Sequence, residues 1–325
     1  MRVCVIGGCG FIGSHTVKHL TDSGCKVLVL DSFTQYCKVP TITSQHHYNV
    51  NYRHQHLLNQ STVMRCSTLN KNDLRRKLYG FKPHVILTFA SLPIVSIAKD
   101  QTEEAFHNIV SGTVNILEVL RDMKCHCRVV FVSSSMVYGN FCYDPQPEDS
   151  PAYPRNVYGG MKLATENIIR SFHWQYGIPF TIIRPSCVYG PTDNNHRIVQ
   201  NFLEAAISKT SAQVDDVTKT MDFSYVKDVA VGISAACTNK KADGQTFNIT
   251  YGKARRIQEL ITIIRNHFSD FAVTKNASDP IAPRRWALDI SNAVGRLNYN
   301  PRYDLEMGIA EYAMFLKKAM RGGSA

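Results

Sequence analysis

The sequence contains no apolar run as long as the roughly 18 to 20 residues that a membrane-spanning helix needs. Its first residues do not follow the order of a secretory signal, because Met1 and Arg2 lead directly into the apolar run Val3–Ile6. It also lacks low-complexity tracts and any internal repeat of about 20 to 50 residues. These absences predict a soluble globular protein without a membrane partner, and the cytoplasm is its expected location.

Acidic residues are scarce relative to basic ones, since 26 Asp and Glu stand against 37 Lys and Arg, for a formal net charge of +11. The basic residues are scattered, without a basic helix stripe or a recognisable nucleic-acid-binding module. We therefore expect no nucleic-acid partner. A pyrophosphate ligand would account for a local excess of positive charge, and so would an ordinary solvated surface.

A disulfide framework is not expected, although the chain has 10 cysteines. Cysteines in or beside apolar segments of a chain without a secretion signal are interpreted as free thiols. Five are of this kind: Cys4, Cys9, Cys25, Cys66 and Cys237. Cys125 and Cys127 flank His126 but have no second ligand pair at zinc-finger spacing. Further histidines lie in a polar stretch interpreted as a surface insertion: His46, His47, His54 and His56. No metal site is predicted.

Short apolar runs alternate with helical patterns from the N-terminus to residue 185. The expected strands are Val3–Ile6, Lys26–Leu30, Val63–Cys66, Val85–Phe89, Val129–Val132 and Phe180–Ile183. The expected helices are His15–Ser23, Asn72–Tyr79, Glu103–Asp122 and Tyr158–Tyr176. Such alternation predicts an α/β fold of Rossmann type, with a doubly wound parallel sheet that the strand Phe180–Ile183 completes.

Beyond Arg184 and Pro185 the regular alternation ends. Helices are predicted near Ile198–Ser208, Val226–Ala236 and Ile257–Phe268. We expect residues 1–185 to form the Rossmann domain and residues 186–325 to form a smaller α/β region that mainly binds substrate. Some segments of this smaller region are expected to return to the Rossmann core.

A glycine-rich turn, G-x-x-G-x-x-G at residues 7–13, follows the first expected strand. Glycines at this spacing let backbone N–H groups approach a pyrophosphate at the N-terminus of the next helix. Asp31 ends the second strand, 18 residues after Gly13, where a carboxylate can accept hydrogen bonds from the ribose hydroxyls of an adenosine. No arginine occurs in Ser32–Thr34. The pattern therefore favours NAD over NADP as the cofactor of residues 1–185.

Tyr158 and Lys162 are four residues apart, one turn along the same face of a predicted helix. A nearby ammonium, together with an oxidised nicotinamide, would lower the pKa of the phenol and prepare it as a general base. The same spacing also occurs in ordinary amphipathic helices. Its position after the fifth strand, which ends in Ser133–Ser135, favours catalysis, because ligands bind at the carboxyl ends of such strands.

The sequence resembles the extended short-chain dehydrogenases of the NAD-dependent epimerase/dehydratase group over nearly its whole length. The matching motifs occur in the family's order: Gly7–Gly13, Asp31, Phe89–Ala90, Asn108 with Gly112–Thr113, Ser133–Gly139, Tyr158 with Lys162, Arg184–Pro185 with Tyr189–Pro191, Asp222–Phe223 with Val226 and Asp228, and Arg284–Arg285 with Asp289–Ile290. The resemblance implies that Ser134, Tyr158 and Lys162 are catalytic.

The same resemblance, with the glycine turn, implies two sets of binding residues. The expected cofactor-binding residues are Gly7, Gly10, Phe11, Ile12, Gly13, Asp31, Ser32, Thr68, Leu69, Phe89, Ala90, Ser91, Asn108, Ser133, Tyr158, Lys162, Pro185 and Val188. The expected substrate-binding residues are Ser134, Ser135, Met136, Tyr158, Cys187, Arg284 and Arg285. The chain departs from the family's usual asparagine at Cys187, usual arginine at Met221 and usual acidic residue at Thr68.

Met136 narrows the reaction that the resemblance implies. Dehydratases and decarboxylases of the family carry a glutamate at this position, and a thioether has no proton to exchange. We therefore expect a nucleotide-sugar epimerase that acts with NAD at C4 of a UDP-hexose or UDP-hexuronate through a 4-keto intermediate. The alternatives are an NAD(P)H-dependent nucleotide keto-sugar reductase and a non-catalytic NAD-binding sensor or scaffold. The long helices Glu103–Asp122 and Tyr158–Tyr176 resemble the pair through which relatives dimerise, so a homodimer is expected.

Overall fold

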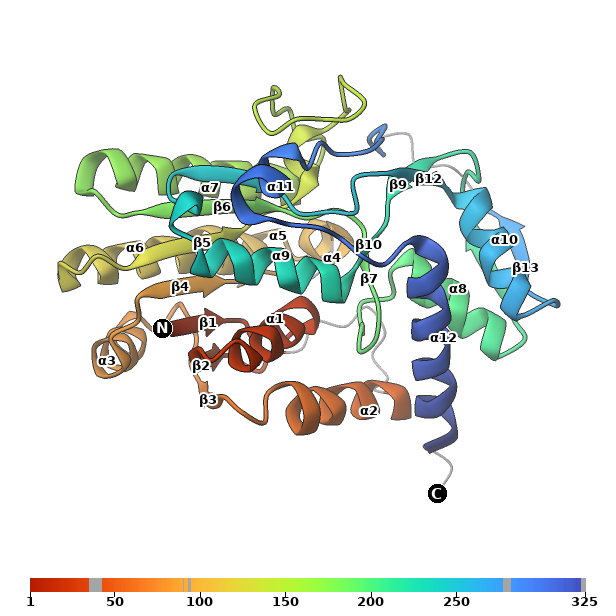
Figure 1. Ribbon diagram of the computed structural model, residues 1–325, viewed down its shortest axis with the longest axis horizontal. Coiled ribbons are helices and arrows are strands. Elements are labelled where there is room, and N and C mark those ends of the chain that lie inside the picture. The colour runs from red at the N-terminus through yellow and green to blue at the C-terminus, as the bar shows by residue number, and fades with distance from the viewer. Residues whose placement is uncertain (35–42, 90, 93–94, 277–281, 323–325) are drawn as a thin grey trace.

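A computed structural model describes residues 1–34, 43–89, 91–92, 95–276 and 282–322 of the chain. Its centre is a parallel seven-stranded sheet in the order β11-β6-β5-β4-β1-β2-β3 (Figure 1). The strands are β1 Arg2–Ile6, β2 Lys26–Asp31, β3 Thr62–Arg65, β4 Val85–Thr88, β5 Arg128–Val132, β6 Phe180–Arg184 and β11 Gln245–Asn248. The predicted Rossmann-type α/β fold is confirmed.

Helices cover both faces of the sheet, so the central strands are apolar throughout rather than alternating. Val3 and Val5 of β1 pack with α1 Phe11–Asp22 and α9 Val226–Thr238 in one core layer. Cys4 and Ile6, the intervening residues, point to the opposite layer. That layer contains α3 Lys71–Phe81, α6 Gly112–Met123 and α7 Val157–Tyr176.

The prediction that the strand at Phe180–Ile183 completes the sheet is wrong. β11 pairs with β6 in parallel register and forms the edge of the sheet, after the chain has returned through α9. The sequence of β11, Gln-Thr-Phe-Asn, contains one apolar residue, so it produces no strand signal by itself. Its place in the sheet comes from the long-range pairing with β6.

The single long helix expected at Glu103–Asp122 is instead a composite. α5 Thr102–Phe106 runs through a π-helical turn at His107–Ser111 into α6. Gly112 allows this bend to lie against Thr68, because a Cβ on Gly112 would be 2.4 Å from the Thr68 hydroxyl oxygen. Asn115 donates a hydrogen bond to the Thr68 carbonyl at 2.9 Å. These contacts hold the segment that follows β3 against the composite helix.

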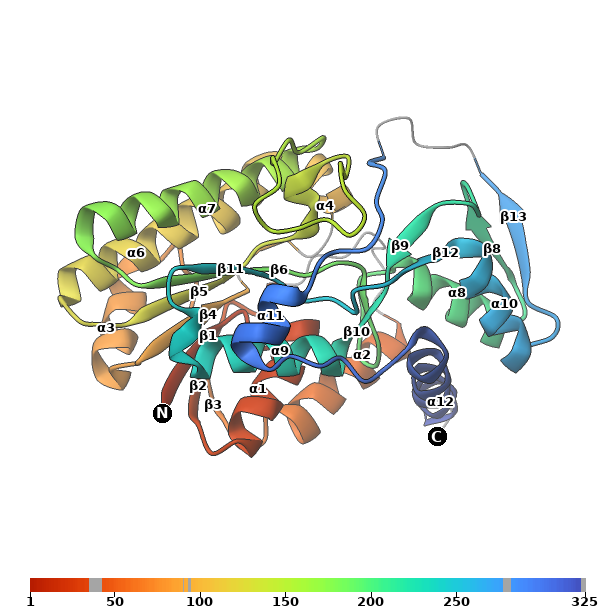
Figure 2. The same cartoon turned by 45° about the horizontal axis from the view of Figure 1, so that its top comes forward.

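A second core lies beside the carboxyl ends of the strands (Figure 2). It is built mainly from α8 Ile198–Ile207, α10 Ile257–His267 and α12 Leu305–Gly322. Helices α8 and α10 confirm the helices predicted near residues 198–208 and 257–268. Short strand pairs complete it: β7 Val188–Tyr189 with β10 Ser224–Tyr225, β8 Ser211–Val214 with β13 Ala272–Lys275, and β9 Thr220–Asp222 with β12 Ala254–Arg256. In the part of the chain that the structure describes, no helix has the length and apolarity to cross a bilayer.

The histidine-bearing stretch is not simply a surface insertion. It forms α2 Ser44–Tyr52 and a π-helical turn at Arg53–Leu57, and α2 lies beside α12 (Figure 1). The rings of Tyr48 and Tyr52 both contact Phe315 of α12, with centroids 5.7 and 5.0 Å away. The opposite face is buried, with Asn49 fully inaccessible and Arg53 8% exposed. The burial of this face could not be predicted from the sequence, because the side chains that it buries are polar.

Candidate active site

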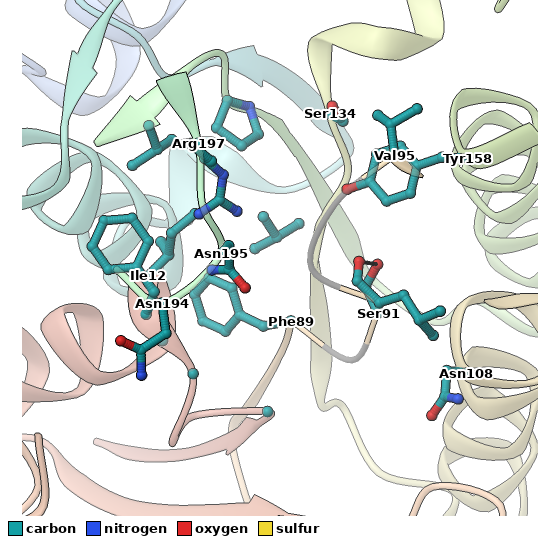
Figure 3. Close-up of a pocket in the computed structure, with 18 of the residues that line it drawn as sticks. Ile12, Phe89, Ser91, Val95, Asn108, Ser134, Tyr158, Asn194, Asn195 and Arg197 are labelled. Atoms are coloured by element: carbon teal, nitrogen blue, oxygen red, sulfur yellow. Dashed lines mark hydrogen bonds between the residues drawn. The ribbon is translucent and has the colours of Figure 1, made fainter. Parts of the chain in front are cut away.

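A large cavity lies at the carboxyl ends of the central strands, where the sheet meets the second core. Its volume is about 1160 Å³, more than a single small ligand requires. Figure 3 shows Tyr158 and Ser91 on one wall, with Arg197 and Asn195 facing them from the other. The position is the one where open α/β sheets bind ligands, because strand ends and helix N-termini face it.

The glycine turn forms the floor of this cavity. A Cβ on Gly13 would lie 2.7 Å from the Gly7 carbonyl oxygen and 2.9 Å from the Gly8 Cα, so only glycine fits there. α1 begins at Phe11 with no side-chain cap, which leaves its first N–H groups directed at the cavity. These groups and the positive end of the helix suit a pyrophosphate.

Asp31 is held at the rim beside the glycine turn. Its carboxylate accepts hydrogen bonds from the Cys9 and Phe33 backbone N–H groups, each at 2.9 Å. Each carboxylate oxygen keeps a second acceptor site for a sugar hydroxyl. The turn and this carboxylate together fit an adenine dinucleotide with a free ribose 2′-hydroxyl, as NAD has.

Most of the expected cofactor-binding residues line the cavity. They are Gly7, Gly10, Phe11, Ile12, Gly13, Asp31, Ser32, Thr68, Phe89, Ser91, Asn108, Ser133, Tyr158, Lys162, Pro185 and Val188. Leu69 does not, because it lies on the surface with 44% of its area exposed. Ala90 lies outside the described residues.

Tyr158 lies in the first turn of α7, at the cavity wall. Asn156 caps the helix by accepting a hydrogen bond from the Gly159 N–H at 2.8 Å. A Cβ on Gly159 would lie 2.6 Å from the Met136 carbonyl oxygen, so this glycine lets the helix approach the serine strand end. Ser134 is thereby brought within hydrogen-bonding reach of the Tyr158 phenol.

Lys162 lies one turn further along α7 and is 2% exposed. Its ammonium donates a hydrogen bond to the Val132 carbonyl at 2.8 Å and lies 4.8 Å from the Phe131 ring centroid. It is 5.7 Å from the centroid of the Tyr158 ring. Burial lowers the pKa of Lys162 to about 7, although the charge of Glu166 acts in the opposite direction.

In this structure the groups that act on the pKa of Tyr158 do not include Lys162, and the expected joint effect of the ammonium and an oxidised nicotinamide stays a prediction. Burial raises the pKa of the phenol, and the groups that oppose the increase are Ser91, Arg197 and Ser134. Lys162 is directed at the carbonyl of β5, over the face of the ring rather than toward the hydroxyl.

Replacing Lys162 by methionine should stabilise the fold at pH 6. The folded-state pKa of about 7 is below the ordinary 10.5, so the buried charge destabilises the native state, fully below pH 7 and progressively less toward pH 10. Each pKa unit corresponds to about 1.4 kcal/mol, so the variant should gain a few kcal/mol at pH 6, less roughly 1 kcal/mol for the lost hydrogen bond. Urea unfolding at pH 6 and pH 9 measures this. An equal gain at both pH values would contradict the explanation.

The three serines at the end of β5 do different things. Ser133 donates a hydrogen bond to Glu166 at 2.6 Å, which fixes the strand end to α7. The Ser135 N–H donates to the Pro185 carbonyl at 3.0 Å, which joins the loop to β6. Ser134 accepts a hydrogen bond from the Met136 N–H at 3.2 Å, so its own proton is available to a ligand oxygen or to Tyr158.

On the substrate side, Cys187 and Arg285 line the cavity together with Met136, and Arg284 does not. The guanidinium of Arg285 lies 3.6 Å from the Met136 sulfur. Arg284 is exposed, and its backbone N–H donates to Asn140. Of the two arginines expected from the sequence, only Arg285 is therefore placed to contact a phosphate in the cavity.

Several cavity residues were not predicted from the sequence. They are Arg53, Lys99, Arg155, Asn194, Asn195 and Arg197, among others. Arg197 donates from one terminal nitrogen to both carboxylate oxygens of buried Asp193, at 2.7 and 2.9 Å, and lies 5.6 Å from the Phe11 ring centroid. No fixed spacing connects these residues to the glycine turn or to Tyr158, so no local pattern could have identified them.

The fold and the cavity define a dinucleotide-binding enzyme class in which a tyrosine, a lysine and a serine meet at the carboxyl edge of a Rossmann sheet. The model of the NAD-dependent epimerase/dehydratase family matches residues 3–250, and the chain belongs to this family.

Its relatives include several 4-epimerases of UDP-sugars. The chain is 29% identical to a putative UDP-glucose 4-epimerase of Methanocaldococcus jannaschii, over 98% of this chain and 99% of that protein. It is 26% identical to UDP-glucuronate 4-epimerase 3 of Arabidopsis thaliana, over 99% of this chain and 77% of that protein. The crystal structure of UDP-glucuronic acid 4-epimerase from Bacillus cereus, in complex with UDP-glucuronic acid and NAD, superposes with a TM-score of 0.88 at 26% identity and covers 98% of this chain and 99% of that one.

Proposed function

We propose that the protein is an NAD-dependent nucleotide-sugar epimerase that inverts C4 of a UDP-hexose or UDP-hexuronate through a 4-keto intermediate. The observation that carries the proposal is the meeting of Ser134, Tyr158 and Lys162 with the glycine turn in one cavity. The relatives named above, which are 4-epimerases of UDP-sugars, support it.

The glycine turn and Asp31 would hold NAD, which when bound would supply the acceptor and donor of a hydride. Tyr158, as the phenolate that the positive charge of an oxidised nicotinamide would favour against the effect of burial, takes the proton of the sugar 4-hydroxyl as the hydride leaves C4, which forms the ketone. Ser134 donates a hydrogen bond to the same oxygen, since its proton is available there. After the sugar presents its opposite face, Tyr158 returns the proton to that oxygen as the hydride is restored, and no further acid or base is needed.

Met136 supports epimerisation over elimination. It lines the cavity two residues after Ser134, and its sulfur lies against Arg285. A thioether beside a guanidinium provides no proton for removing water or for assisting loss of a carboxylate. A keto-sugar reductase would use the same trio, but it would consume one reduced dinucleotide for each sugar.

We further propose that the enzyme acts as a homodimer through the composite helix α5–α6 and helix α7. These helices pack on each other, and large apolar side chains of the same region are exposed, including Phe106 at 47% and Trp174 at 84%. Such side chains are typical of surfaces that another subunit covers. The division into residues 1–185 and 186–325, and the location in the cytoplasm, remain predictions.

The proposed activity is tested with the purified protein and a panel of UDP-glucose, UDP-galactose, their N-acetyl forms and UDP-glucuronate. We expect bound NAD in the preparation and conversion of at least one sugar to its 4-epimer without added reductant, measured by NMR. Turnover that requires stoichiometric NADH would establish the reductase instead. Tight NAD binding without conversion of any sugar would favour the non-catalytic alternative.

A further inference from the structure

The loop of residues 190–197 connects β7 to α8 and contacts α1, the helix that follows the glycine turn. His15 of α1 lies 3.0 Å through Nε2 from the Pro191 carbonyl oxygen and 3.4 Å from the Thr192 hydroxyl. Thr192 and Asp193 are almost completely buried, at 0% and 1% exposure. This loop is therefore a packed part of the cavity wall.

Arg53 connects this loop directly to the glycine turn. One guanidinium nitrogen donates to the Cys9 carbonyl at 3.1 Å, and the other terminal nitrogen donates to the Thr192 carbonyl at 2.5 Å. The two carbonyls belong to segments more than 180 residues apart, yet one planar group bridges them. A lysine could not make this bridge in the same way, because its ammonium is a single point of donation.

Asn49, one turn earlier, holds the same loop from α2. Its side-chain amide donates to the Asp193 carbonyl at 3.2 Å and to the Asn194 side chain at 2.6 Å. Asn194 in turn lies 3.5 Å from the His46 carbonyl. Asp193 then orients Arg197 toward the cavity, so a continuous set of contacts runs from α2 to the cavity wall.

Packing alone does not explain these buried polar groups. Among the described residues, the Arg53 Nε and the Asn49 Oδ1 are buried without a hydrogen-bond partner, which destabilises the fold. Burial lowers the pKa of Arg53 to about 10. The carboxylates of Asp193 and Asp31 oppose that decrease, as do the Cys9 thiol and the Tyr312 phenol. The hydrogen bonds from Arg53 to the Cys9 and Thr192 carbonyls offset part of the cost of this burial, so they are the contacts through which the buried guanidinium stabilises the cavity wall.

We infer that Arg53 is a positioning residue that ties the glycine turn to the 190–197 loop and thereby slows release of the bound dinucleotide. The inference rests on the proposed function, because an epimerase must keep the same dinucleotide between removal and return of the hydride. Arg53 acts through the backbone of both segments and does not contact the reacting atoms.

The test compares Arg53→Met with Arg128→Met, a matched control far from the cavity. Arg128 is also buried and also bridges two carbonyls, those of Asn239 and Cys237, at 2.9 and 2.6 Å. Both variants should lose stability to a similar degree. Only Arg53→Met should release NAD faster, by roughly 10- to 100-fold as expected for lost hydrogen bonds to a charged group. The readout is NAD remaining on the protein through gel filtration, with the release rate measured after dilution.

During turnover, Arg53→Met should also lose reduced dinucleotide to solution, and added NAD should restore most of its rate. If Arg53→Met does not fold, Asn49→Ala removes the second anchor of the loop and should accelerate release in the same direction. Release rates equal to the wild type in the variant that folds would overturn the inference. A wild-type protein that holds NAD but converts no sugar would refute the proposed function, and the release measurement would still decide the role of Arg53.

Discussion

Replacing Tyr158 by phenylalanine should lower turnover by about 10²- to 10⁴-fold, the range expected when a positioned general base is removed. The ring keeps its packing against the apolar cluster that contains Leu92 and Ile97, and its place under the Lys162 ammonium, so the fold should be unchanged. Only the hydroxyl that Ser134 and Ser91 contact is lost. Initial rates on the best sugar of the panel, together with the NAD content of the purified variant, measure the effect.

Tyr176→Phe provides the control on the same helix. Tyr176 lies at the far end of α7, is 43% exposed and does not line the cavity. This variant should keep the wild-type rate. Full activity in Tyr158→Phe with NAD still bound would show that the proton of the sugar hydroxyl goes elsewhere, and the mechanism proposed above would be wrong.

Replacing Arg184 by methionine should lower the free energy of unfolding by about 3 to 5 kcal/mol, as expected when one partner of a buried ion pair is removed. Arg184 donates to the two Glu166 oxygens at 3.0 and 2.6 Å, and Glu166 is fully buried. Burial opposes ionisation of Glu166, but the hydrogen bonds and charge of Arg184 outweigh it and hold the pKa of this carboxyl below its ordinary value.

The loss should depend on pH, and the sign follows from that lowered pKa. The pair stabilises the native state above the ordinary pKa of a glutamate, near 4.3, and this contribution disappears on acidification. The difference between wild type and variant should therefore be largest at neutral pH and smaller at pH 4, as measured by urea unfolding. Arg184→Met combined with Glu166→Gln should recover part of the loss. A loss below about 1 kcal/mol at pH 7 would contradict this account.

Local sequence patterns were sufficient for the parts of the site that depend on a few neighbouring residues. The glycine turn could be predicted because Gly13 has no room for a Cβ, a requirement of the turn itself. Tyr158 and Lys162 could be paired because four residues are one helical turn. Asp31 could be assigned because it ends the second strand, 18 residues after Gly13.

Other assignments required the folded chain. The choice of Arg285 over Arg284 depends on which way two adjacent side chains point, and a sequence motif contains no such information. The rise in the pKa of Tyr158 depends on the burial of its phenol, which only the folded chain produces. Leu69 follows Thr68 in the predicted cofactor set, yet it faces solvent while Thr68 lines the cavity.

The amino-acid sequence by itself determined the Rossmann-type core, the preference for NAD and the Tyr158–Lys162 pair, because each arises from contacts within one strand, turn or helix. Tertiary structure alone decided that β11 closes the edge of the sheet and that Arg53 joins the glycine turn to the 190–197 loop. These two features bring together segments far apart in the chain. Their free energy comes from long-range backbone pairing and from buried polar contacts, which local periodicity does not record.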